Sequence, residues 1–327
     1  MQQALRDKIF TVTDSSFDAL ALEIFRFQFA NNPVYAAFCK GIGRNPENVK
    51  RAEEIPFLPV EVFKTHEVYA AEKTPETVFT SSGTTGAITS RHLVADLSLY
   101  EESFLKTFQL FYGDPESWTI LALLPSYLER EGSSLVYMAE TLVKKSAQPG
   151  SGFYLHNYAA LSAKLRSLEA NGKKCLLLGV TYALLDLAEQ FPHPLKHTVI
   201  METGGMKGKR RELVREELHA VLKNAFGVNA IHSEYGMTEL LSQAYSKGDG
   251  IFNCPPWMKI CIREMNDPFA YAATGKTGGV NIIDFANLYS CSFIATSDLG
   301  RSNADGSFEI LGRFDFSDLR GCNLMVE

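Results

Sequence analysis

The chain has 327 residues, of which 46% are hydrophobic, and it carries a formal net charge of −6 at pH 7. This acidic balance excludes the basic surface that nucleic acids or anionic membranes bind, and no apolar run is long enough to span a bilayer. Six scattered cysteines without a CxxC pair, and an N-terminus without an apolar signal segment, favour a cytoplasmic protein over a secreted or zinc-binding one.

The first elements expected along the chain are a helix and a proline-stiffened connection. Residues 17–39 carry apolar side chains at helical spacing after an N-cap at 14–16, and Pro33 is expected to break or kink this helix. Residues 55–60 are apolar but contain two prolines, which excludes a regular helix or a central strand. We therefore expect this stretch to pack as a fixed connection.

Helix-like and strand-like segments alternate in the middle of the chain. Helices are expected over residues 97–112, 134–145, 158–171, 182–191 and 212–226, and buried strands over 118–124, 175–180, 197–202 and 230–234. This alternation predicts an α/β fold with largely parallel sheets up to about residue 248. Short β-like runs without intervening helices follow at 258–263, 279–285, 290–295 and 307–311. They predict a small antiparallel β-rich subdomain over residues 249–311.

A run of hydroxyl residues and glycines follows the first expected strand end. It reads Thr80, Ser81, Ser82, Gly83, Thr84, Thr85 and Gly86. Glycine lets the backbone approach a ligand closely, and hydroxyls with free backbone N–H groups suit phosphate oxygens. The Walker A pattern is absent. The sequence therefore indicates either a phosphate-binding loop of another kind or a flexible turn.

Further residues with binding chemistry follow later strands, where ligands of open α/β sheets bind. An aromatic ring can stack on a base, a carboxylate can hold Mg²⁺ or ribose hydroxyls, and an arginine fork can meet a phosphate. These residues are Gly204 and Gly205, then Tyr235, Gly236, Thr238 and Glu239, then Asp298, and finally Arg313. The structural alternative is that Asp298 is a turn residue and Tyr235 a core aromatic. His92 and His232 are interpreted as packed structural histidines.

The order of these motifs carries a resemblance that covers nearly the whole chain. The series TSSGTTG, GG, YGMTE, TSDLGR and GRFD resembles the adenylate-forming superfamily of acyl-CoA synthetases and luciferase-like enzymes. Within it, the stretches IPFLPVEVFK and LLPSYLEREGSSLVYM are similar to the LuxE-type acyl-protein synthetases. The resemblance implies one large domain of that fold over residues 1–311, with 312–327 as a hinge remnant and tail and without the mobile C-terminal domain.

The resemblance also implies nucleotide contacts for matching positions. The loop Thr80 to Gly86 wraps the β- and γ-phosphates of ATP. Gly204 and Gly205 line the adenine slot, Tyr235 lies against the base, and Gly236 also contacts the nucleotide.

Three further positions are catalytic by the same resemblance. Thr238 contacts the α-phosphate, Glu239 holds Mg²⁺, and Arg313 contacts ribose or phosphate, while Asp298 binds the ribose hydroxyls. The implied reaction joins a carboxylic acid, by preference a fatty acid, to AMP with release of pyrophosphate. The acyl group then passes to a thiol of coenzyme A, a carrier protein or an acyl reductase. Cys322 is the candidate acyl acceptor within the chain, unless it is an incidental residue.

The chain departs from the superfamily pattern at two places that concern charge. Arg91 stands near the position after the glycine-rich loop where many members have lysine, and residues 316–327 contain no lysine. Two alternatives to the ligase therefore stay open. One is a subunit that binds nucleotide or acyl-adenylate without independent turnover. The other is an acyltransferase that uses a thiol or a hydroxyl such as Ser133.

Overall fold

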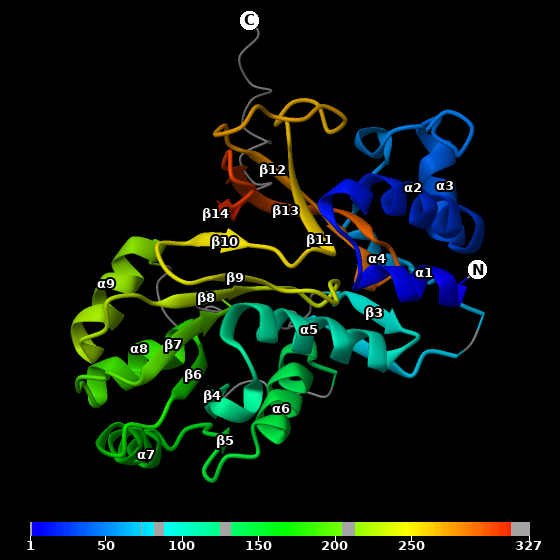
Figure 1. Ribbon diagram of the computed structural model, residues 1–327. Helices are drawn as coiled ribbons and strands as arrows, with labels where there is room; N and C mark the ends of the chain where they lie inside the picture. The colour runs from blue at the N-terminus through cyan, green and yellow to red at the C-terminus, as the bar shows by residue number, and fades with distance from the viewer. Residues whose placement is uncertain (1, 73, 82–87, 125–131, 205–212, 315–327) are drawn as a thin grey trace, which may run out of the picture.

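The structure is a computed structural model that describes residues 2–72, 74–81, 88–124, 132–204 and 213–314. Its described strands form one 12-stranded sheet and a separate two-stranded ladder (Figure 1). The strands of the sheet are β1 (Leu58–Pro59), β4 (Thr119–Leu123), β5 (Gly152–Phe153), β6 (Cys175–Val180), β7 (Thr198–Thr203), β8 (His232–Tyr235), β9 (Ala244–Ser246), β10 (Ile251–Asn253), β11 (Met258–Arg263), β12 (Gly278–Asp284), β13 (Phe293–Ser302) and β14 (Phe308–Arg313). The ladder pairs β2 (Thr77–Thr80) with β3 (Arg91–Val94).

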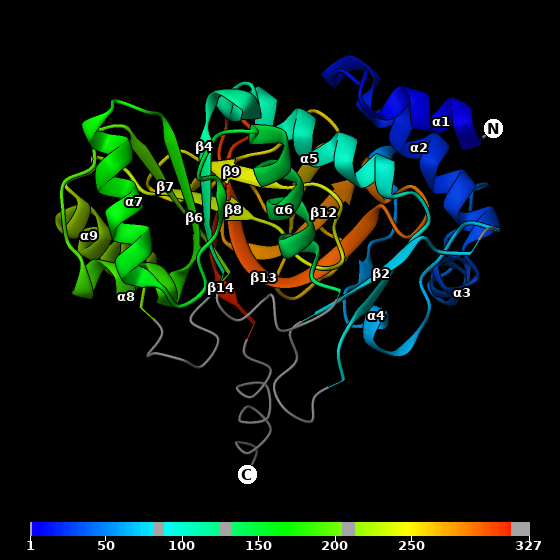
Figure 2. The same cartoon turned by 90° about the horizontal axis from the view of Figure 1, so that it is seen from below.

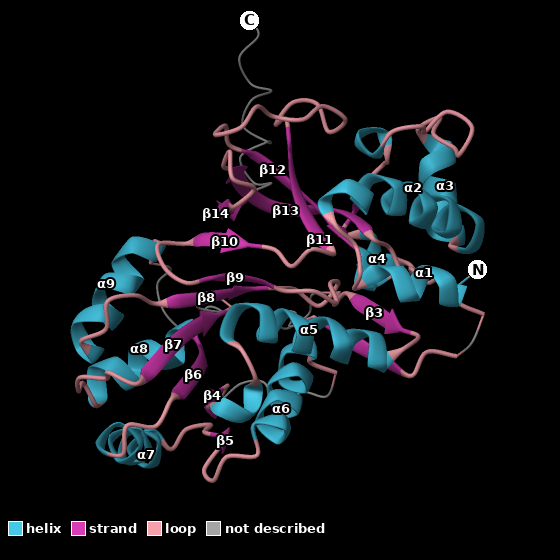
Figure 3. Ribbon diagram, in the orientation of Figure 1, coloured by secondary structure: helices cyan, strands magenta, loops and turns pink. Residues whose placement is uncertain are grey.

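The helices form two groups around this sheet. Figure 2 shows the parallel strands between α7, α8 and α9 on one side and α5 and α6 on the other, while Figure 3 shows the N-terminal helices beside the antiparallel strands. The α-helices are α1 (Gln2–Ile9), α2 (Asp14–Asn31), α3 (Pro33–Gly41), α4 (Val62–Thr65), α5 (Leu97–Tyr112), α6 (Ser134–Ser146), α7 (Tyr158–Ala170), α8 (Thr181–Gln190) and α9 (Arg215–Phe226). Three short 3₁₀ turns are η1 (Ala52–Glu54), η2 (Pro115–Ser117) and η3 (Phe285–Asn287).

The parallel part of the sheet has the order β5-β4-β6-β7-β8. Every residue of β4 and of β6 is buried, because helices cover both faces of these strands. The predicted α/β alternation is confirmed, and the expected helix over residues 97–112 matches α5 residue for residue. The sheet also continues beyond β8, through the antiparallel order β9-β10-β14-β13-β12-β11.

The antiparallel part differs from the sequence expectation in two details. The short strands β9 and β10 were not predicted, because three residues are too few for a periodic pattern. The strand expected over residues 290–295 is wrong in its bounds, because β13 runs over Phe293–Ser302 and so includes the TSDLGR motif. Asp298 therefore lies in a strand and is not a turn residue. The fold class, parallel α/β with a C-terminal antiparallel region, is as expected.

The break at Pro33 occurs where it was predicted and it also attaches the N-terminal helices to the antiparallel strands. Pro33 is the first residue of α3, where its missing N–H leaves no helical bond unmade. Asn32 precedes it and accepts a hydrogen bond from the Tyr35 amide (3.0 Å). The Asn32 side chain also donates to the carbonyl of Ser290 (2.8 Å). A second apolar core, formed by α1–α4 with β11–β13, lies around this junction.

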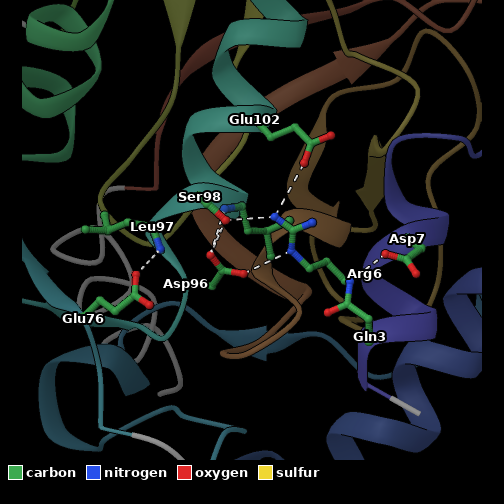
Figure 4. A network of polar contacts seen from close by, with 9 residues as sticks. Gln3, Arg6, Asp7, Glu76, Asp96, Leu97, Ser98 and Glu102 are labelled. Carbon is green, nitrogen blue, oxygen red and sulfur yellow. Dashed lines mark hydrogen bonds and ion pairs between the residues drawn. The ribbon is translucent and has the colours of Figure 1, made fainter.

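A polar network connects the first helix to the start of α5 (Figure 4). The guanidinium of Arg6 donates to Asp96 (3.1 Å) and Ser98 (2.9 Å), and it lies 3.6 Å from the carboxylate of Glu102. Asp96 also caps α5 by accepting from the Leu99 amide (3.3 Å). These contacts place α1 against the helix that covers the parallel strands.

Gly300 of the TSDLGR motif is required by close packing between strands. A Cβ at this position would lie 2.6 Å from the carbonyl oxygen of Glu309 and 2.8 Å from a methyl group of Val280. We expect Gly300→Ala to lower the free energy of unfolding by roughly 1–3 kcal/mol, because the backbone of β14 must shift. Urea denaturation measures this. Gly152→Ala is the control, because nothing lies within 4 Å of the added carbon; equal losses in both variants would contradict the argument.

Candidate functional site

Three residues predicted from separate motifs are joined in the structure. The hydroxyl of Tyr235, at the end of β8, donates to Oδ2 of Asp298 (2.7 Å), and Nε of Arg313 donates to Oδ1 of the same carboxylate (3.1 Å). Asp298 and Arg313 are register partners in β13 and β14, which explains their contact. The Asp298 side chain is 7% exposed, whereas that of Arg313 is 78% exposed. The site therefore offers a fixed carboxylate beneath an accessible guanidinium.

Arg263 braces the strand that carries Asp298, and sequence reasoning missed it. Its guanidinium donates to the carbonyls of Val280 (2.9 Å) and Thr296 (2.7 Å), which lie on the neighbouring strands β12 and β13. The hydroxyl of Thr296 accepts from the amide of Asp298 (3.1 Å). Burial lowers the pKa of Arg263, and the nearby acids Glu61 and Asp298 act in the opposite direction. An arginine in an alternating strand gives no sequence signal of this bracing role.

The carboxyl of Glu239 lies at the meeting point of several elements. Burial raises the pKa of this group, while a hydrogen bond from the Ser90 side chain and the charges of Arg313 and Lys64 oppose that rise. The side chain of Asn287 donates to the Glu239 carbonyl (2.7 Å) and so holds its backbone. Glu239 is 6% exposed. The charges of two cations from different parts of the chain therefore act on this carboxyl.

The described base of the glycine-rich loop connects to Glu239 through Ser90. The amide of Thr80 donates to the carbonyl of Gly132 (2.8 Å). The amide of Ser90 donates to Oγ of Ser81 (2.9 Å), and the amide of Ser81 donates back to the Ser90 carbonyl (3.1 Å). Ser90, which sequence reasoning missed, therefore bridges the loop base and the acid. The predicted residues Ser82, Gly83, Thr84, Thr85, Gly86, Gly205 and Cys322 lie outside the described residues.

The carboxyl ends of β7 and β8 bring a second pair of acids together. Burial raises the pKa of Glu234 to about 7, with a further rise from Glu202, although the hydroxyl of Thr203 donates to Glu234 and opposes both. A side chain at Gly236 would displace the Glu234 carboxyl from its bond with Thr203, because a Cβ would lie 2.5 Å from a Glu234 carboxyl oxygen. Gly204 follows β7 with φ +63°, a conformation that favours glycine. Its carbonyl accepts from the Thr181 hydroxyl (2.9 Å).

His92 of β3 positions the backbone of Thr238. Nδ1 lies 2.9 Å from the Thr238 carbonyl, and Nε2 lies 2.8 Å from Oγ of Ser290. A carbonyl only accepts, so Nδ1 carries the proton and Nε2 accepts from the serine hydroxyl. Burial lowers the pKa of His92 to about 4. His92 is therefore a neutral packed residue, as expected, with the specific role of holding the residue before Glu239.

His92 gives the protein a defined pH dependence of stability. Because its pKa falls from an ordinary 6.5 to about 4 on folding, the unfolded chain binds the proton first. Its stabilising contribution is complete above pH 6.5 and is lost as pH falls toward 4. We expect His92→Asn to remove a slope of about 1.4 kcal/mol per pH unit in this window. Urea denaturation between pH 4.5 and 7 measures it, with the exposed His156→Gln as control; an unchanged slope in His92→Asn would contradict the assignment.

No protein-family model and no curated protein matches the chain. Solved structures do match. ATP-bound MatB from Rhodopseudomonas palustris aligns with TM-score 0.55 at 17% identity over 86% of this chain and 58% of that one. An ATP-bound RpMatB–BxBclM chimera aligns with TM-score 0.53 at 18% sequence identity, over 72% of this chain and 47% of the chimera. A 2-hydroxyisobutyryl-CoA ligase with 2-HIB-AMP and CoA, in its thioesterification state, aligns with TM-score 0.65 at 14% sequence identity, over 95% of this chain and 71% of the ligase.

These likenesses define the fold of the chain. It has the fold of adenylate-forming acyl-CoA ligases, and it spans about half the length of the first two structures it matches. Among the described residues, no helix is long and apolar enough to cross a membrane. The same part of the chain contains no group of three His, Cys, Asp or Glu residues arranged to hold a metal ion. Its five described cysteines are free.

Proposed function

We propose that the protein is an AMP-forming carboxylate ligase, which activates a carboxylic acid with ATP as an acyl-adenylate. The observation that carries this proposal is the convergence of Tyr235, Asp298, Arg313 and Glu239. They come from three motifs that are distant in sequence. Tyr235 and Arg313 both contact Asp298, and the charge of Arg313 acts on the Glu239 carboxyl. The fold shared with ATP-bound and acyl-AMP-bound ligases supports the same activity.

Each residue has a chemical task in this reaction. The Asp298 carboxylate accepts hydrogen bonds from ribose hydroxyls, and the accessible guanidinium of Arg313 binds ribose or phosphate oxygens. The ring of Tyr235 lies against the adenine, beside Gly204 and Gly236. Thr238, held by His92, contacts the α-phosphate. The described loop residues Thr80 and Ser81 begin the segment that binds the β- and γ-phosphates.

Glu239 fits a magnesium ion. Mg²⁺ is usually held by one or two carboxylates together with substrate phosphates, so a single acid suffices. Burial disfavours the charged form of Glu239, and a cation beside the carboxylate offsets that penalty. When bound, the ion neutralises charge on the phosphates. Glu239 would hold the ion beside the phosphates, and Tyr235, Asp298 and Arg313 would orient the nucleotide.

The proposals for the carboxylic acid substrate and for the acyl acceptor come from the sequence resemblance. We propose a fatty acid as substrate and a thiol as acceptor, in the manner of the LuxE-type synthetases. The thiol belongs to coenzyme A, a carrier protein, an acyl reductase or Cys322. A cytoplasmic location agrees with the free cysteines.

The experiment that tests this function is carboxylate-dependent exchange of labelled pyrophosphate into ATP. A panel of fatty, short hydroxy and aromatic acids names the substrate class, and calorimetry measures ATP binding separately. Exchange with one acid class supports the ligase. Clear ATP binding without exchange for any acid would replace it with a nucleotide-binding subunit, and absence of both would leave the acyltransferase.

A further inference from the structure

We propose that the ammonium of Lys64 binds the reacting anions, namely the α-phosphate of the nucleotide and the incoming carboxylate. Lys64 belongs to the IPFLPVEVFK stretch, for which the ligase reaction described above gives no task. The inference rests on the proposed function, because it names a further catalytic residue for that reaction.

The short helix α4 is attached to the site at several points, and this places Lys64. Before α4, β1 pairs in parallel with β13, and the amide of Val60 donates to the Ala295 carbonyl (2.9 Å). Glu61 accepts a hydrogen bond from the hydroxyl of Ser297, the neighbour of Asp298. One end of this segment therefore lies beside the strand that carries the predicted ribose-binding acid.

The middle of α4 is attached to the other side of the site. Phe63 is buried, and its ring packs edge-on against His92 with the centroids 5.7 Å apart. His92 in turn holds the carbonyl of Thr238, the residue before Glu239. Lys64 follows Phe63 directly and is exposed. Its backbone is fixed by the bond from its amide to the Glu61 carbonyl (3.0 Å).

The charge of Lys64 acts toward the site and is not used by another described acid. Of the described cations, Lys64 and Arg313 are the two that act on the Glu239 carboxyl. Within the described residues, no acid lies within ion-pair distance of the Lys64 ammonium, whereas Arg313 is paired with Asp298. Of these two described cations, Lys64 therefore has its ammonium free of any described acid, whereas Arg313 shares its Nε with Asp298 and offers a bound anion only the rest of its guanidinium.

The reaction needs such a cation. A carboxylate oxygen attacks the α-phosphorus and forms the acyl–phosphate bond, while the bond from the α-phosphorus to the bridging oxygen breaks and its electron pair leaves with pyrophosphate. No proton is transferred, so two anions must approach each other directly. A positioned ammonium reduces their repulsion and stabilises the charge of the transition state.

The test compares AMP with adenosine, because the two differ only in the α-phosphate. We expect Lys64→Ala to weaken AMP binding roughly tenfold in calorimetry and to leave adenosine binding unchanged. Pyrophosphate exchange should fall by roughly the same factor, and Lys64→Arg should recover part of it. Lys276→Ala, an exposed lysine outside the site, is the control and should behave as wild type.

The outcomes separate this inference from the proposed function. If wild type exchanges and Lys64→Ala binds AMP and exchanges as well as wild type, the Lys64 inference is wrong and the ligase stands. If wild type does not exchange but Lys64→Ala loses AMP affinity selectively, the phosphate contact stands and the ligase fails. If adenosine affinity falls equally, or if wild type binds neither ligand, Lys64 has no anion-specific role.

Discussion

Glu239→Gln is expected to lower carboxylate-dependent pyrophosphate exchange by at least about 100-fold. The change keeps the size of the side chain and its hydrogen bond with Ser90, but it removes the charge that would hold Mg²⁺. The carbonyl bond from Asn287 is a backbone contact and is unaffected. Exchange kinetics at saturating ATP and acid, measured over a range of magnesium concentrations, check this expectation.

A control variant shows whether the effect of Glu239→Gln comes from the lost charge at the site or from the loss of any negative charge. Glu140→Gln removes an acid on the surface of α6, where its partner is Lys144, and should exchange like wild type. Melting temperatures of both variants show whether the fold is retained. A Glu239→Gln variant that exchanges within threefold of wild type would remove Glu239 from the catalytic machinery.

Asp298→Asn is expected to weaken ATP binding by between about 10- and 100-fold. This range corresponds to the free energy of the hydrogen bonds from ribose hydroxyls to a charged carboxylate. Asparagine still accepts from the buried hydroxyl of Tyr235, so that group keeps a partner. The variant loses the ion pair with Arg313 and the two-oxygen acceptor for ribose hydroxyls. Calorimetry with ATP and with 2′,3′-dideoxy-ATP measures the effect.

Comparing ATP with 2′,3′-dideoxy-ATP tests the ribose contact itself, because the two nucleotides differ only in the ribose hydroxyls. Wild type should bind ATP more tightly than the dideoxy analogue, and Asp298→Asn should discriminate between them much less. Asp249→Asn, at an exposed turn near Lys223, is the matched control. If Asp298→Asn keeps full discrimination, Asp298 serves only to position Tyr235 and Arg313.

The sequence predicted most of the parallel half of the fold, because its patterns are local. The helix α5 has apolar residues at helical spacing and a capping Asp96, and β6 is a continuous apolar run. The antiparallel half was less predictable. Asp298 and Gly300 are residues typical of turns, yet both lie in β13. Gly300 is there because the backbone of β14 lies too close for a side chain, which is a tertiary cause.

The candidate site was predictable where it rests on motifs and unpredictable where it rests on packing. Tyr235, Asp298 and Arg313 were expected at the ends of strands, and the structure brings these three side chains into contact. Ser90 and Arg263 were missed, because each acts through a partner that is distant in sequence. The roles of these three residues in nucleotide binding, and the roles of Thr238, Glu239, Gly204 and the loop, stay predictions.

The pairing of β1 with β13 has a consequence for the order of events during synthesis. Residues 58–59 leave the ribosome more than 200 positions before their strand partners at 294–295. Asn287 and Ser292, which are hydrogen-bond partners of Gln28, are also made long after it. The core of α1–α4 therefore stays without its covering strands for most of translation. Contacts of such long sequence separation form slowly, and exposed apolar surface in the interval promotes aggregation. Newly made chains should depend on chaperones until β13 has emerged.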